Sequence, residues 1–82
     1  MKIEEKLKEL GFKEIKNNTL RAGKLFIIKF PSKEIIEVHV SDNIKYIGVY
    51  NKYSEYIQLS LNTIEQISFL VLAFGYKNKN LI

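Results

Sequence analysis

The sequence predicts one α+β domain, residues 1–82, folded as a small two-layer sandwich. The expected order is a helix, an antiparallel meander of four or five strands and a second helix, with both helices on one face of the sheet. Three observations lead to this prediction. Apolar residues recur with a helical period at both ends of the chain. Between the ends they alternate with polar residues. Turn-forming residues separate the alternating runs at short intervals.

The first helix is predicted from Ile3, Leu7 and Leu10, which fall on one stripe of a 3.6-residue period. Gly11 suits the left-handed position that commonly follows a helix. Phe12 is then expected to fold back onto Leu7, because a hydrophobic contact of this kind often accompanies such a helix end. The helix should therefore stop at Gly11.

The middle of the chain, residues 12–61, is predicted to form strands. The alternating runs are 12–15, 24–30, 34–41, 44–50 and 56–61. Period-two patterning with closely spaced turns is typical of an antiparallel meander with one covered face and one wet face. In the fourth run, strict alternation places Tyr46 and Tyr50 on the same face as Ile44, so both tyrosines are candidates for the core.

The second helix begins where the helical period returns, in the stretch "LNTIEQISFLVLAFGY". Two reciprocal capping boxes fit its start: Asn62 with Glu65, or Thr63 with Gln66. The boundary therefore stays open by one residue.

Gly75 is expected to end the second helix as Gly11 ends the first, with Tyr76 returning onto Val71. Residues 77–82 should then form a frayed C-terminal tail.

The second helix has more apolar residues than one buried stripe needs. Its expected core stripe is Ile64, Ile67, Leu70, Val71 and Phe74. Phe69, Leu72 and Ala73 lie on the opposite face, where solvent is expected. Either another part of the chain covers them, or they form, with Tyr76, the interface of a homodimer or of a complex with a protein partner. A contact with a membrane surface is disfavoured, since the face lacks a dense lysine band.

Composition excludes several classes of chemistry. The chain has no cysteine, so it has neither a disulfide framework nor a thiolate metal site. Its net charge is +4, and all 13 basic residues except Arg21 are lysine. Arginine is the residue suited to bidentate contacts with phosphate and guanine, so this composition disfavours specific DNA recognition. The apolar run 67–74 is far shorter than the ~20 residues that span a bilayer, and the N-terminus lacks the apolar core of a signal peptide. We expect a cytoplasmic protein without a membrane span.

No residue pattern indicates catalysis or a cofactor. His39, the only histidine, lies near Glu37 and Asp42 and invites the hypothesis of a general base or a weak metal ligand in a hydrolase. A metal site needs at least three convergent ligands, and no nucleophile partner is evident. A surface histidine on the wet sheet face is the simpler interpretation. Since glycine-rich phosphate loops and nucleophile elbows are also absent from the sequence, we predict no enzyme activity, metal or cofactor.

The stretch "IKYIGVYNKYSEY", residues 44–56, is the strongest candidate for a binding site. Tyrosine gives large, rigid contact area suited to protein interfaces. The same pattern also suits aromatic pairing within a hairpin, or base stacking with lysines along a nucleic-acid backbone. The candidate contact residues are Tyr53, Tyr56, Lys45, Lys52 and Tyr50. Tyr53 and Tyr56 are the better candidates, because Tyr53 falls in the turn and Tyr56 faces away from Ile57 and Leu59.

The size, the single domain, the bias to lysine, isoleucine and asparagine and the lack of catalytic groups are similar to those of small accessory proteins of phages and other mobile elements. Anti-CRISPR proteins are among them. This similarity of type implies a non-enzymatic module that binds and inhibits or modulates a protein in the cytoplasm of a host cell. The alternative is a weak, sequence-tolerant nucleic-acid-binding protein that uses the Lys/Tyr surface of the sheet.

Overall fold

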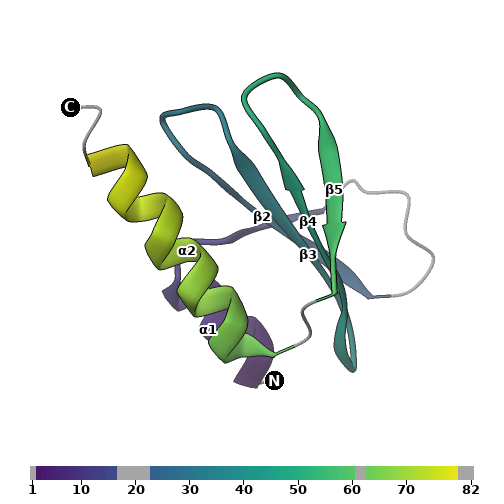
Figure 1. Ribbon diagram of the computed structural model, residues 1–82. Helices are drawn as coiled ribbons and strands as arrows, with labels where there is room; N and C mark the ends of the chain where they lie inside the picture. The colour runs from purple at the N-terminus through teal and green to yellow at the C-terminus, as the bar shows by residue number, and fades with distance from the viewer. Residues whose placement is uncertain (1, 17–22, 61–62, 80–82) are drawn as a thin grey trace.

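The computed structural model describes residues 2–16, 23–60 and 63–79, and it confirms a small α+β fold with an antiparallel meander. The two helices lie beside one another on the same side of the sheet (Figure 1). In chain order the elements are α1 (Lys2–Glu9), β1 (Lys13–Ile15), β2 (Lys24–Lys29), β3 (Ile35–Ser41), β4 (Asn43–Tyr50), β5 (Tyr56–Leu59) and α2 (Ile64–Lys79).

The sheet has the simplest antiparallel topology. Each strand pairs with its sequence neighbour, so the spatial order is β1-β2-β3-β4-β5. The short strands β1 and β5 therefore form its two edges. Turns with residues at positive φ join the strands from β2 to β5: Lys33 lies between β2 and β3, Asp42 between β3 and β4, and Ser54 between β4 and β5.

The core lies between the helices and one face of the sheet. Leu7 of α1 and Ile67 of α2 are fully buried against side chains from the central strands. The buried sheet residues are Phe26, Ile36, Val38, Val40, Ile44 and Ile47. At the far end of α2, the ring of Phe74 stacks on Phe30, with 5.3 Å between the ring centroids. Both helices are thus held to the same apolar face.

The predicted end of the first helix is confirmed. Gly11 has a φ of 103°, and its N–H donates to the carbonyl of Lys8 at 3.0 Å. The N–H of Phe12 donates to the carbonyl of Leu7, also at 3.0 Å. These two bonds are the Schellman pattern, which satisfies carbonyls at a helix end. Phe12 and Leu7 are both buried in the core, as the sequence predicts.

The start of the second helix is capped by Thr63 and Gln66. The Gln66 N–H donates to the Thr63 Oγ1 at 3.3 Å, and the Thr63 N–H donates to the Gln66 Oε1 at 3.2 Å. This reciprocal pair is one of the two predicted capping boxes. Asn62, the cap of the other, lies outside the described residues.

The prediction that Gly75 ends the second helix is wrong. The helix continues through Gly75 to Lys79, so residues 77–79 form its last turn rather than the start of a tail. A glycine inside a helix costs only about 1 kcal/mol relative to alanine. The packing of Phe74 on Phe30, one residue earlier, holds the helix in place at this point.

The predicted facing of the fourth strand is also wrong. Val40 pairs with Ile44, whereas the preceding residue, His39, pairs with Tyr46, so Lys45 is an extra residue in the ladder. A bulge of this kind shifts the alternation of side chains by one position. Ile44 and Ile47 can therefore both enter the core. Tyr46 and the later Tyr50 face away from the helices.

Candidate functional site

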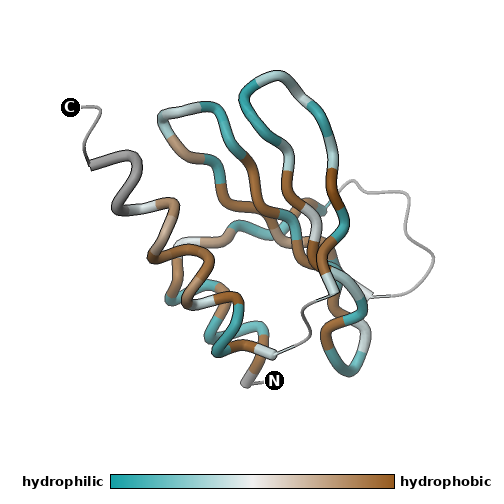
Figure 2. The backbone as a smooth tube through the Cα atoms, viewed as in Figure 1, coloured by the Kyte–Doolittle hydropathy of each residue, from teal (hydrophilic) through white to brown (hydrophobic). Residues whose placement is uncertain are grey.

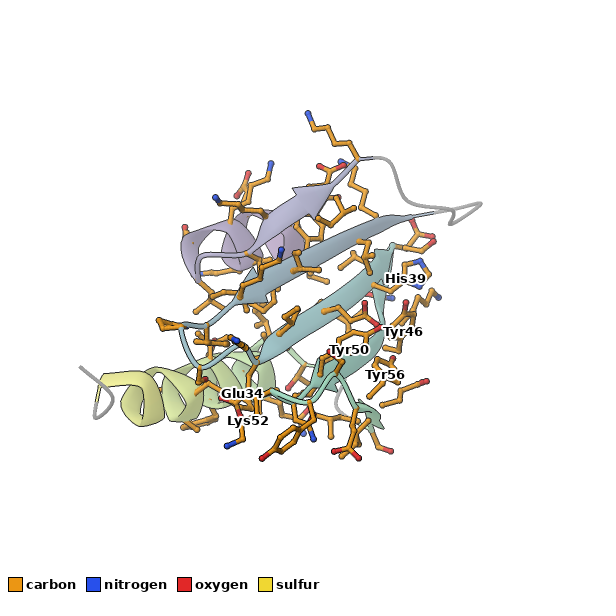
Figure 3. The ribbon with its side chains drawn as sticks, turned by 90° about the horizontal axis from the view of Figure 1, so that it is seen from above. Glu34, His39, Tyr46, Tyr50, Lys52 and Tyr56 are labelled. Carbon is orange, nitrogen blue, oxygen red and sulfur yellow. The ribbon has the colours of Figure 1, made fainter. Side chains whose placement is uncertain are left out.

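The open face of the sheet, on the side away from both helices, carries a cluster of tyrosines. The register places Tyr46 opposite His39, and Tyr50 opposite Tyr56. Figure 3 shows these four side chains gathered at one side of the sheet. No helix or strand within the described ranges covers this face. The cluster is therefore available to a partner.

Tyr56 is held in place by three neighbours. Its ring lies 4.9 Å from the ring of Tyr50, in a tilted arrangement. It also extends across the surface of Gly48, since a Cβ atom built on that glycine would lie 2.3 Å from the Tyr56 Cε1. Its hydroxyl donates a hydrogen bond to the carboxylate of Glu37 on β3. A side chain from the edge strand thus spans β4 and reaches β3.

The same surroundings change the acidity of Tyr56. Removal of its hydroxyl from water, reinforced by the negative charge of Glu37, raises the pKa of Tyr56 to about 12. Partial burial and the Glu37 charge also raise the pKa of Tyr46. A tyrosine is neutral near pH 7 even at its ordinary pKa of 10.0, and the raised pKa keeps each phenol protonated, and so able to donate a hydrogen bond, further into the alkaline range.

A second group of candidate residues lies at the tip of the β4–β5 hairpin. The Asn51 Oδ1 accepts hydrogen bonds from the N–H groups of Tyr53 at 2.9 Å and Glu55 at 3.0 Å, and its Nδ2 donates to the Glu55 carboxylate at 2.8 Å. This Asn-centred turn presents Tyr53, whose side chain is 72% exposed. The ammonium of Lys52 lies 5.2 Å from the centre of the Tyr53 ring, within the range of a cation–π contact.

The structure brings together four of the five predicted contact residues and separates the fifth. Tyr50, Lys52, Tyr53 and Tyr56 lie along the end of one hairpin. Lys45 lies near the other end of β4, roughly 16 Å from Tyr50 at the usual rise of an extended strand. We use the name tyrosine surface for Tyr46, Tyr50 and Tyr56 on the open face together with Lys52 and Tyr53 at the hairpin tip.

The other predicted interface, on the back of α2, is exposed. Phe69 and Leu72 are 72% and 58% exposed, and Ala73 is exposed as well. The alternative explanation, that another part of the chain covers them, does not hold for the part of the chain that the structure describes. The side chain of Tyr76, the fourth predicted residue, lies outside the described part.

His39 packs against an aromatic neighbour on the open face. Its ring lies 5.2 Å from that of Tyr46. Glu37, one of its two predicted acidic neighbours, bonds with Tyr56 instead. Among the described residues, no three His, Cys, Asp or Glu side chains come together in a way that could hold a metal ion.

Sequence reasoning missed the contribution of Gly48 and assigned Tyr46 and Tyr50 to the wrong face. One signal was present in the sequence. Ile44 and Ile47 are three residues apart, a spacing that strict alternation cannot bring to one face. When both are buried, the strand between them must contain a bulge, and the tyrosines that follow must face outward.

The fold and this surface define a small α+β protein with tyrosines on the open face of its sheet and exposed apolar residues on α2. The chain matches no family model, no curated protein and no solved structure. None of the described helices is both long enough and apolar enough to cross a membrane.

Proposed function

We propose that this chain is a non-enzymatic protein-binding module whose contact surface is the tyrosine surface. The observation that carries the proposal is the fixed position of Tyr56, between Tyr50, Gly48 and Glu37 on an uncovered sheet face. Aromatic side chains that are ordered before binding lose little entropy in a complex, and they are the usual anchors of protein interfaces. The exposed Tyr53 extends this anchor at the hairpin tip.

The charge around the surface favours a partner of acidic character. Lys52 lies over Tyr53 at the hairpin tip, and Lys45 is exposed farther along β4, roughly 16 Å from Tyr50. Glu37, the acidic residue in the centre, is engaged by the hydroxyl of Tyr56. With the net charge of +4, these lysines favour the approach of an anionic protein.

The second part of the proposal concerns the effect of binding on the partner protein. In the manner of phage and mobile-element accessory proteins such as anti-CRISPR proteins, the module would inhibit or modulate a larger host protein by occupying part of its surface. Size, composition and the single domain support this step.

The experiment that tests the proposal is capture of a partner from host extract by the tagged full chain. The variants are wild type, Tyr53→Ala with Tyr56→Ala, and Lys8→Ala as a control at an exposed position of α1. We expect a specific partner with wild type and with the control, and its loss with the double variant, which should remain folded although its melting temperature falls by roughly 4–8 °C. Equal capture by all three proteins would refute the tyrosine surface as the contact site.

A second candidate function is favoured by the exposed Lys52–Tyr53 pair. An aromatic ring with a lysine beside it can stack on a base and contact a phosphate, which allows weak, sequence-tolerant binding of nucleic acid. Such binding would weaken steeply with added salt. A titration of labelled single- and double-stranded oligonucleotides at low salt, with no change in anisotropy, would eliminate this candidate.

A further inference from the structure

The face of α2 that points away from the core carries exposed apolar side chains at regular intervals. In Figure 2, hydrophobic residues follow one another through the middle of the helix. Ile67 faces the core and is fully buried, whereas Phe69 and Leu72 point away from it. A face with two large exposed apolar side chains on a protein of 82 residues is a candidate interface.

The shape of this face fits another helix. Two hollows flank Phe69, and each is formed by four residues of α2. Both hollows are shallow and open to solvent. One is lined by Gln66, Phe69, Leu70 and Ala73, and the other is lined by Glu65, Ser68, Phe69 and Leu72. Both sets have the spacing i, i+3, i+4, i+7, which is the four-residue hole that receives one side chain of a facing helix in knobs-into-holes packing.

The sequence along the face has the matching repeat. Glu65, Phe69 and Leu72 are spaced by four and three residues, and the same spacing continues at Tyr76 and Lys79. Alternating steps of four and three residues define the seam of a helix pair. The face therefore presents both the holes and a regular row of side chains to fill them.

The charges at the two ends of α2 favour a second copy of the same helix as the partner, in antiparallel orientation. Glu65 lies in the first turn of α2, and lysines occupy positions 77 and 79 in the last turn. Two copies in antiparallel orientation place the acidic start of each helix beside the basic end of the other. This orientation also makes the two helix dipoles antiparallel, which is favourable. A parallel pair would place like charges together at both ends.

We propose that α2 is the interface of a homodimer, formed by an antiparallel pair of α2 helices from two copies of this chain. A two-fold axis between Phe69 and Leu72 brings Phe69 of each copy against Leu72 of the other, as an isologous contact requires. The 16-residue helix is about 24 Å long. A contact of this size is at the small end of specific interfaces, so the dimer should dissociate on dilution. This inference is independent of the proposed function, because the tyrosine surface lies on the opposite side of the sheet from α2.

Sedimentation equilibrium of the full chain over a wide concentration range tests the dimer. We expect a monomer–dimer equilibrium for wild type and a rise of about tenfold or more in the dissociation constant for Leu72→Lys. Circular dichroism checks that the variant is folded, and Phe69→Ser provides a second test at the neighbouring position. The Tyr53→Ala, Tyr56→Ala variant should dimerise like wild type. A wild-type chain that remains monomeric at every concentration, or a dimer that persists in folded Leu72→Lys and Phe69→Ser, overturns the proposal.

Charge reversal tests the direction. In the antiparallel pair, Glu65→Lys should weaken self-association, and so should Lys77→Glu with Lys79→Glu. A mixture of these two variants should recover it, because opposite charges then meet at both ends. If Glu65→Lys alone leaves self-association unchanged, the antiparallel pairing is wrong.

Discussion

The ring of Tyr56 occupies the space that a side chain at position 48 would need. A Cβ atom on Gly48 would lie 2.3 Å from the Tyr56 Cε1 and 2.4 Å from its hydroxyl oxygen. Carbon atoms that are not bonded to one another do not approach so closely in stable structures. Glycine at position 48 is therefore what lets a tyrosine of the edge strand lie flat across β4 and reach Glu37.

Gly48→Ala should displace the Tyr56 ring from its place. We expect a loss of stability of about 1 kcal/mol, since the ring can rotate outward but gives up its contacts with Tyr50 and Glu37. Urea denaturation of the single variants and of Gly48→Ala in a Tyr56→Ala background forms a double-mutant cycle. In the Tyr56→Ala background the substitution should cost almost nothing. An equal cost in both backgrounds would show that Tyr56 does not depend on Gly48.

Tyr56 should make stability depend on pH in the alkaline range. The folded chain holds the Tyr56 proton until about pH 12, whereas the ordinary value of the pKa is 10.0. Between these two pH values the folded state therefore binds more protons than the unfolded state. The contribution of Tyr56 to the free energy of unfolding is fully present below pH 10 and is lost as the pH rises toward 12. Tyr56→Phe should show a shallower fall in the same range.

The measurement is urea unfolding at a series of pH values, with tyrosinate absorbance recorded in parallel. At neutral pH, Tyr56→Phe should cost no more than about 1 kcal/mol through the lost hydrogen bond to Glu37. Identical pH profiles of wild type and Tyr56→Phe would contradict the raised pKa of Tyr56, which burial and the charge of Glu37 produce.

Asn51→Ala should loosen the hairpin tip that presents Tyr53. The change removes the acceptor of two backbone N–H groups and one donor to Glu55. The expected cost is about 1 kcal/mol, with faster amide exchange at residues 53 and 55. Glu55→Gln, which leaves the Asn51 acceptor in place and keeps an acceptor oxygen for its amide, is the matched control and should retain the protection. Unchanged exchange rates in Asn51→Ala would show that the turn does not need this side chain.

Gly75→Ala should stabilise the protein. Apart from the adjacent residues and the backbone of the same helix, no atom of the described chain lies within 4 Å of a Cβ built at this position, and the residue lies inside α2. Alanine is favoured over glycine in a helix by about 1 kcal/mol, so the urea midpoint should rise. If Gly75 instead ended the helix in a left-handed conformation, the same substitution would lower it, as the strained Gly11→Ala should.

The helix boundaries show what the sequence can predict. At Gly11, local signals agree: the left-handed glycine, the two returning hydrogen bonds and the Phe12 contact all favour the same stop. At Gly75, the local signal is similar but the outcome differs: the helix continues to Lys79, and the stack of Phe74 on Phe30 anchors the turn that precedes the glycine. A glycine is a weak signal when packing nearby is worth more than its helix penalty.

The tyrosines show a different limit. Their clustering in the sequence predicted the hairpin as a contact region. The face of the sheet on which they lie, however, depends on the bulge at Lys45, which the sequence analysis did not predict. The bulge arises because both Ile44 and Ile47 enter the core, and that requirement comes from the helices on the other side of the sheet. Similarly, the pattern of α2 identified Phe69 and Leu72 as surplus apolar residues, but only the three-dimensional structure shows them uncovered within the described chain.

The open aromatic face of the sheet and the hydrophobic core are built from different parts of the chain. The open-face tyrosines and Glu37 come from β3, β4 and β5, which follow one another with only short turns between them. The core, in contrast, needs Leu7 and Ile67, which are contributed by the two ends of the chain. Contacts between sequence neighbours form early and at little entropic cost, whereas joining the ends requires closure of a long loop. The hairpins can therefore assemble before the helices cover the sheet, and the aromatic face can take shape earlier in folding than the core beneath it.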